Sequence, residues 1–296
     1  MYKINTTTEN GMRIIELVNA SKTTSAKINL DQGARLQELK FNDIYLIKEQ
    51  EGFDYATSYA SSILFPFASR IENGKYTFQG EEFKFNCNDG NNALHGLVYD
   101  KPFELFEPEE HGHCCFATFN YYEKKRSVGF PFTYFFSVTY TLFEDYLKIS
   151  ITVKNMDKLS FPFTLGWHPY FNCNDFENSH LSFKSDEKVL LDENLITKEV
   201  VAKKTPEVFE IHKKELDDCF VLNDNTVTFS TPDYKVEITQ NSVNSFLQLY
   251  TPKDIPAIAI EPMTGVSNSF NNKIGLQVLE PKQTHVFNCK VKLIND

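Results

Sequence analysis

Alternating apolar and polar positions recur along the chain and indicate β-strands with one buried face. The alternation is clearest over residues 136–142 and 147–153, where every second residue is apolar and a short polar turn separates the two runs. This pattern predicts a β-hairpin.

Similar signals continue towards the C-terminus. Residues 76–78 and 83–85 flank a short connection at 79–82 that contains Gly80, which predicts a second hairpin. The pattern also predicts strands in three later segments, which are residues 227–229, 236–238 and 287–293.

Long amphipathic helices are not predicted, because no long stretch repeats apolar residues at positions i, i+3, i+4 and i+7. Many short strands with frequent turns favour an all-β fold, a large antiparallel sandwich. Neither a repeat nor a linker is evident, so we expect one domain over residues 1–296. The polar stretch 186–214 is interpreted as a solvated excursion within it.

Composition and charge favour a β-rich protein and argue against two classes of partner, nucleic acids and membranes. The 27 Phe and 14 Tyr residues suit half-buried strands. A net charge of −10 without a basic stripe argues against nucleic acid as a partner. The first ten residues lack the apolar core of a signal peptide, and no run of about 18 apolar residues occurs. We therefore expect a cytoplasmic protein that does not bind membranes.

Several catalytic signatures are missing from the sequence. It contains no GxGxxG, GxxxxGK[ST], HExxH or GxSxG motif, so dinucleotide, P-loop, zinc-protease and serine-hydrolase chemistry lack support. The six cysteines form no CxxC pair, which predicts reduced thiols and no zinc site. Histidines and carboxylates remain as candidates for chemistry.

Two of the seven histidines lie in unusual surroundings. His95 precedes a glycine in Asn-Ala-Leu-His-Gly, and His168 lies in Gly-Trp-His-Pro-Tyr-Phe. Glycine permits close approach of the backbone, and aromatic rings can line a pocket. Each histidine alone also fits a hydrogen-bonded position in the core.

Glu261 and Arg70 are the other unusual charged residues. Glu261 follows the apolar run 255–260 and precedes Pro262, so its carboxylate lies where a strand meets a turn. Burial of a carboxylate requires a partner or a raised pKa, although a surface position at a strand end is the alternative. Arg70, one of four arginines, lies in an apolar segment. It could bridge hydroxyl groups or pair with a carboxylate.

Taken together and in this order, these segments resemble the aldose 1-epimerase (galactose mutarotase) family over essentially the whole chain. The matching segments are 69–76 around Arg70, 92–96 around His95, 168–172 from His168, 216–220 around Asp217, 246–250 around Gln248 and 260–262 around Glu261.

The resemblance implies a galactose mutarotase-like β-supersandwich that needs neither cofactor nor metal. It implies that Glu261 is the general base and His168 the general acid, and that sugar hydroxyls are held by His95, Arg70, Asp217 and Gln248. Three departures from the galactose-type pattern, Ser69, Pro169 and Pro262, argue against inferring galactose as the substrate.

Mutarotation explains why such residues are needed. Opening a sugar ring requires a base for the C1 hydroxyl and an acid for the ring oxygen, and a carboxylate with an imidazolium supplies both. The predicted partner is a free aldose, and the predicted assembly is a monomer or homodimer. If this interpretation is correct, all six side chains converge on one pocket, with Arg70 at its wall.

Three alternatives remain open. A hexose-6-phosphate 1-epimerase would need cationic groups for the phosphate, and few arginines are available. A non-catalytic carbohydrate-binding sandwich would not need a matched acid and base. A glycoside hydrolase or lyase would use two carboxylates, for which Asp217 and Glu261 are candidates.

Overall fold

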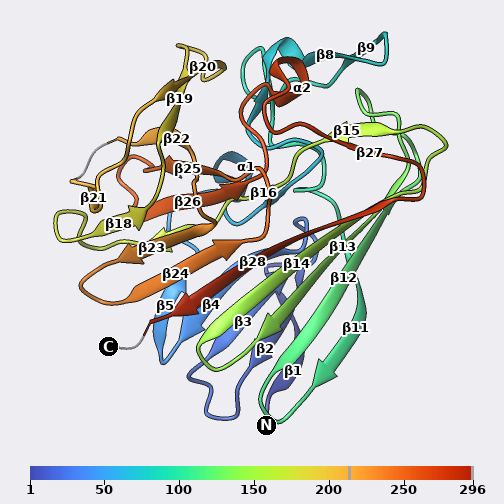
Figure 1. Ribbon diagram of the computed structural model, residues 1–296. Helices are drawn as coiled ribbons and strands as arrows, with labels where there is room; N and C mark the ends of the chain where they lie inside the picture. Colours follow the sequence, from blue (N-terminus) through green and yellow to red (C-terminus); the bar gives the residue numbers. More distant parts are fainter. Residues whose placement is uncertain (213–214, 295–296) are drawn as a thin grey trace.

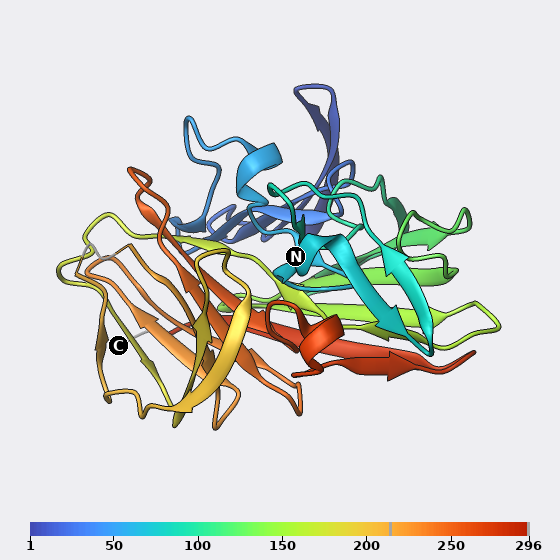
Figure 2. The same cartoon turned by 90° about the horizontal axis from the view of Figure 1, so that it is seen from above.

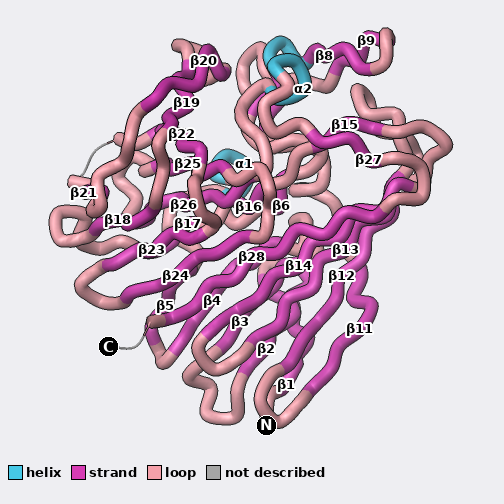
Figure 3. The backbone as a smooth tube through the Cα atoms, viewed as in Figure 1, coloured by secondary structure: helices cyan, strands magenta, loops and turns pink. Residues whose placement is uncertain are grey.

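The computed structural model describes residues 1–212 and 215–294, and its regular elements are almost entirely β-strands (Figure 1, Figure 3). Three large antiparallel sheets dominate. The N-terminal sheet has the order β1 (Lys3–Glu9), β2 (Met12–Val18), β3 (Ser25–Asn29), β4 (Arg35–Phe41) and β5 (Ile44–Ile47).

A nine-stranded sheet, here called the long sheet, combines the middle and the end of the chain. In spatial order it contains β11 (Glu104–Glu110), β12 (Cys115–Glu123), β13 (Tyr134–Leu142), β14 (Tyr146–Asn155), β28 (Thr284–Leu293), β24 (Lys235–Gln240), β23 (Thr226–Ser230), β18 (His180–Phe183) and β21 (Phe209–Glu210). The C-terminal strand β28 is central, because it pairs with β14 on one side and β24 on the other.

The third sheet carries the candidate site and is called the site sheet. Its order is β20 (Thr197–Ala202), β19 (Glu187–Leu191), β22 (Asp217–Val221), β25 (Phe246–Tyr250), β26 (Ala257–Met263), β16 (Gly166–Trp167) and β6 (Ile63–Leu64), and β17 (Tyr170–Asn172) also pairs with β26. All seven residues of β26 are buried, so both faces of this strand are covered.

Short elements connect the sheets. Three two-stranded ribbons are formed by β7 (Arg70–Ile71) with β10 (Ala93–Leu94), β8 (Lys75–Phe78) with β9 (Glu81–Lys84), and β15 (Phe161–Phe163) with β27 (Gln277–Leu279). The helices are single turns, namely α1 (Tyr55–Ser58), α2 (Ser269–Asn272) and the 3₁₀ turn η1 (Glu72–Gly74). No helix in the described ranges is long and apolar enough to cross a membrane.

The N-terminal sheet covers one face of the long sheet, as the view from above shows (Figure 2). A buried hydrogen bond joins them, because the Tyr140 hydroxyl donates to the Ala34 carbonyl oxygen at 2.8 Å. One contiguous core holds side chains from all three large sheets, including Leu17, Ile151 and Leu249. The fold is therefore the large antiparallel β-supersandwich that the sequence predicts.

The predicted strands occur where alternation is clean. Residues 136–142 and 147–153 lie in the hairpin of β13 and β14, and 287–293 lies in β28, where Phe287, Cys289, Val291 and Leu293 are buried. The interpretation of 186–214 as an excursion is wrong for the 13 residues that form β19, β20 and β21. Charged residues hid these strands, since they lie near the outer edges of two sheets. Residues 213–214 lie outside the described part.

Candidate active site

Three neighbouring strands of the site sheet bring Asp217, Gln248 and Glu261 to one face. Gln248 in β25 pairs directly with Glu261 in β26, and it pairs on its other side with Cys219 in β22. Asp217 lies two residues before Cys219, so its side chain points to the same face. The Gln248 amide Nε2 donates a hydrogen bond to Asp217 Oδ1 at 2.7 Å.

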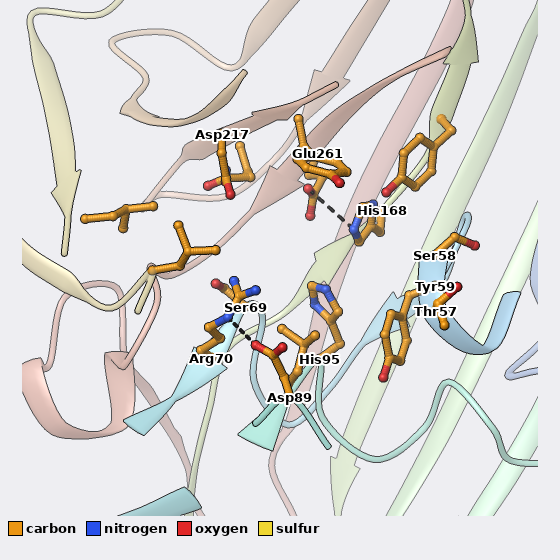
Figure 4. Close-up of a pocket in the computed structure, with 16 residues that line it drawn as sticks. Thr57, Ser58, Tyr59, Ser69, Arg70, Asp89, His95, His168, Asp217 and Glu261 are labelled. Carbon is orange, nitrogen blue, oxygen red and sulfur yellow. Dashed lines mark hydrogen bonds and ion pairs between the residues drawn. The ribbon is translucent and has the colours of Figure 1, made fainter. Parts of the chain in front are cut away.

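His168 approaches Glu261 from the opposite side of β26. It lies between β16 and β17, both of which pair with β26. Its backbone is fixed by two hydrogen bonds, from its own N–H to the Ser62 carbonyl at 3.0 Å and from the Ser61 N–H to its carbonyl at 2.8 Å. The His168 Nε2 atom lies 3.6 Å from Glu261 Oε1 (Figure 4).

The ribbon of β7 and β10 supplies Arg70 and His95. Leu94 pairs with Arg70, and the His95 N–H donates to the Ser69 carbonyl at 2.9 Å. His95 has a left-handed backbone with φ of 61°, which is uncommon for a residue other than glycine. Its ring meets the His168 ring edge to face, with centroids 5.0 Å apart.

Gly96 is the residue that permits this approach. Its φ is 77°, and a Cβ atom at this position would lie 2.1 Å from the Phe65 carbonyl oxygen. A side chain cannot occupy that space. The close backbone approach predicted for the glycine after His95 is therefore confirmed.

The side chains converge on one pocket of about 260 Å³ (Figure 4). It is lined by Arg70, His95, His168, Asp217, Gln248 and Glu261, the six residues singled out from the sequence. The predicted convergence is confirmed.

Arg70 fits both interpretations of its sequence position. Its Nε atom donates to Asp89 Oδ2 at 2.6 Å, while the guanidinium also lines the pocket. Figure 4 shows Arg70 across the pocket from Glu261 and His168, with Asp89 on the side of the guanidinium away from Glu261.

Burial dominates the electrostatics of the acid–base pair. Glu261 and His168 are 3% and 5% exposed, so a charge on either is poorly solvated. Burial raises the pKa of Glu261 well above its usual value, and the Asp217 carboxyl adds to the rise while Arg70 opposes it. The expected shift of the Glu261 pKa is thus supported in direction.

The pKa values of the two histidines shift in the opposite direction to that of Glu261. Burial lowers the pKa of His168 to about 3, and Arg70 contributes to the lowering. Burial also places the pKa of His95 well below its usual value, with His168 and Arg70 as further causes. These shifts favour a neutral imidazole at His168 and a protonated carboxyl group at Glu261, and the imidazolium expected at His168 stays a prediction.

Sequence reasoning missed several wall residues. Tyr59 contacts the His95 ring edge to face, and Asp89 pairs with Arg70. Leu191 and Leu195 line the pocket from the stretch that was interpreted as an excursion. The only available signal was the Asn-Asp-Gly turn at 88–90, which precedes the His95 segment by a few residues.

The sequence profile of the family described as "Aldose 1-epimerase" matches residues 13–292. The chain belongs to the aldose 1-epimerase family.

Two proteins from Escherichia coli K12 are similar in sequence to this chain. The chain is 24% identical to uncharacterized protein YihR over 267 residues, which cover 86% of this chain and 85% of that protein. It is 27% identical to an aldose 1-epimerase over 199 residues, which cover 65% of this chain but only 55% of that protein.

The fold has close structural counterparts as well. A galactose mutarotase-like protein from Clostridium acetobutylicum superposes with a TM-score of 0.89, covering 100% of this chain and 99% of that chain at 18% sequence identity. This likeness establishes the galactose mutarotase-like fold.

Proposed function

We propose that this protein is an aldose 1-epimerase that interconverts the α and β anomers of a free, neutral aldose. The observation that carries the proposal is the buried pair of His168 and Glu261, whose side chains face each other across 3.6 Å in a polar pocket. An acid and a base in contact, with pKa values pushed apart by burial, suit reversible proton transfer.

The pair carries one proton in its working state. Protonated Glu261 with neutral His168 has the same net charge as carboxylate with imidazolium, so the proton can move between the two residues without changing the charge of the pocket. Burial favours the first form, because it disfavours both charges. Sugar hydroxyls that hydrogen-bond to the ions stabilise the second form.

Ring opening uses the second form. The Glu261 carboxylate removes the proton of the C1 hydroxyl, C1=O1 forms as the C1–O5 bond breaks, and the His168 Nε2–H protonates O5. This leaves Glu261 protonated and His168 neutral, the form that burial favours. Rotation about C1–C2 followed by the reverse transfers gives the other anomer.

The remaining pocket groups bind the sugar in this proposal. Arg70 presents its two terminal guanidinium nitrogens opposite the acid–base pair, and His95 faces the same space. Asp217 and Gln248 are joined by a hydrogen bond, so each is oriented before sugar binds. Such orientation lowers the entropy cost of positioning C1.

Charge supports a neutral substrate over a hexose 6-phosphate. Among the described residues lining the pocket, Arg70 is the only Lys or Arg, and Asp89 already neutralises it. A purely binding role is disfavoured because a binder does not need a buried carboxyl group, which destabilises the fold at neutral pH. A hydrolase using Asp217 is disfavoured because Gln248 holds that carboxyl.

Anomer exchange measured by NMR tests the proposal. Purified protein is mixed with glucose, galactose, xylose and arabinose, and separately with glucose 6-phosphate, and the rates are compared with those in buffer. We expect faster exchange for at least one neutral aldose. Acceleration confined to the phosphate, or none at all, would contradict the proposal.

A further inference from the structure

The wall of the pocket opposite the acid–base pair is shared with a second hollow of about 430 Å³. Both spaces are bounded by Arg70, Asp89 and Leu195. The second hollow contributes two more carboxyl side chains, Glu72 and Glu193, and Arg70 is the only Lys or Arg among its described lining residues. The one Lys or Arg among the described residues that line the two spaces is therefore Arg70, which is paired with Asp89.

Asp89 holds a fixed position at this junction. Its backbone N–H donates to the Asn92 carbonyl at 3.1 Å, and the Asn92 N–H donates to the Asp89 carbonyl at 2.9 Å. The neighbouring Asn88 side chain bonds both the N–H and the carbonyl of Leu94. The turn is thereby tied to the strand that precedes His95, which fixes the backbone of Asp89 near Arg70.

The ion pair with Asp89 uses one hydrogen-bond donor of Arg70 and leaves its other donors for the pocket. Asp89 takes the Nε donor, whereas no other described side chain pairs with the guanidinium, so both terminal nitrogens remain available to the pocket. Those donors can still bind sugar hydroxyls. The positive charge that would attract an anionic sugar is cancelled by a carboxylate a hydrogen bond away.

We propose that Asp89 is a specificity-determining residue that makes the site reject anionic sugars, such as uronates and sugar phosphates, while leaving Arg70 able to bind neutral ones. This inference rests on the proposed function. A uronate is the sharpest probe, because glucuronate differs from glucose only by a carboxylate in place of the C6 hydroxymethyl group. The physical basis of the discrimination is that an anionic sugar meets no uncompensated cation in the pocket, because Asp89 already neutralises Arg70.

The test compares kcat/KM for anomer exchange of glucuronate with that of glucose. Asp89→Asn removes the negative charge, yet its amide oxygen can still accept from Arg70 Nε. We expect the glucuronate-to-glucose ratio to rise by about tenfold or more, the size expected for one charge in a partly screened site. Asp89→Glu retains the charge and should keep the ratio of the parent.

Glu193→Gln is the matched control. It removes one carboxylate from the second hollow without touching Arg70, so the ratio should stay within about twofold of the parent. Should Asp89→Asn fail to fold, Asp89→Ser serves the same comparison. An unchanged ratio in the neutral variant, or an equal rise in Glu193→Gln, would overturn the inference.

Failure of this inference is distinguishable from failure of the proposed function. A parent protein that accelerates no neutral aldose contradicts the function itself. A parent that is active on glucose or galactose, but whose ratio does not respond to Asp89→Asn, contradicts only the role of Asp89. Galactose with galacturonate replaces the glucose pair if galactose is the better substrate.

Discussion

At the scale of single residues, the burial of Glu261 links catalysis to stability. Its folded-state pKa lies well above the unfolded value, so its contribution is fully present at acid pH and is lost as the pH rises towards the folded pKa. Each unit of pKa difference corresponds to about 1.4 kcal/mol. Glu261→Gln removes this titration while keeping the shape of the side chain.

We therefore expect Glu261→Gln to stabilise the protein at neutral pH and to lose that advantage near pH 4. Thermal unfolding of parent and variant across this range measures the gap in Tm. A variant that is less stable than the parent at neutral pH, by an amount independent of pH, would show that the Glu261 pKa is not raised.

Asp217 tunes the same group. Its carboxyl raises the pKa of Glu261, so Asp217→Asn should lower that pKa. In the proposed mechanism activity requires one proton on the pair of His168 and Glu261, and the alkaline limit of activity is the loss of that proton. We expect the alkaline limb of the pH profile of kcat to move to lower pH in Asp217→Asn, whatever the change in KM. An alkaline limb that stays at the same pH or moves to higher pH would contradict this coupling between Asp217 and Glu261.

At the scale of elements, the ribbon of β7 and β10 determines where His95 lies. Gly96 makes the ribbon possible, because the Phe65 carbonyl occupies the space of a side chain. Gly96→Ala should destabilise the protein by more than about 1 kcal/mol and should reduce turnover by about 10²-fold, since His95 must shift. Denaturant unfolding and anomer exchange measure the two effects.

Gly80→Ala is the control for this prediction. Gly80 also has a positive φ, at 86°, but no atom lies within 4 Å of a Cβ placed there. Comparison of the two variants separates the free-energy cost of placing Ala in a left-handed backbone from the cost of the steric clash at residue 96. Equal losses of activity in the two variants would contradict the positioning role of Gly96.

How well an element can be predicted from the sequence depends on its surroundings. The hairpin of β13 and β14 is predictable because one face is buried and alternation follows directly. β26 is buried on both faces, so it does not alternate, and the interpretation of Glu261 as a strand-end residue missed that the strand continues to Met263. β19 and β20 lie towards the edge of the site sheet, where polar residues conceal them.

The residues of the site can likewise be predicted only where the local sequence distinguishes them. Glu261, His168, His95 and Arg70 stand out because each is a polar residue in an apolar or glycine-containing segment. Asp89 is marked only as part of the Asn-Asp-Gly turn at 88–90, which does not reveal a partner, and the pairing of β7 with β10 brings that turn towards Arg70. The protonation of the pair also depends on burial, which a local pattern does not reveal.

At the scale of the whole molecule, one core joins sheets that are built from distant parts of the chain. Buried residues from Tyr2 to Leu293 belong to the same cluster, and β28 pairs with strands from two regions of the sequence. We expect residues 1–296 to unfold as one domain in a single cooperative transition. Calorimetry tests this, because two resolved transitions, or a van't Hoff enthalpy well below the calorimetric one, would contradict it.

In the proposed mechanism, Glu261 performs the proton transfer of anomer exchange. The most direct measurement is the NMR exchange rate of the preferred neutral aldose with parent and with Glu261→Gln, after both have been shown to be folded by their melting transitions. We expect the variant to lose at least about 10²-fold in kcat, because a positioned base contributes that much. Exchange by the folded variant at the rate of the parent would contradict it.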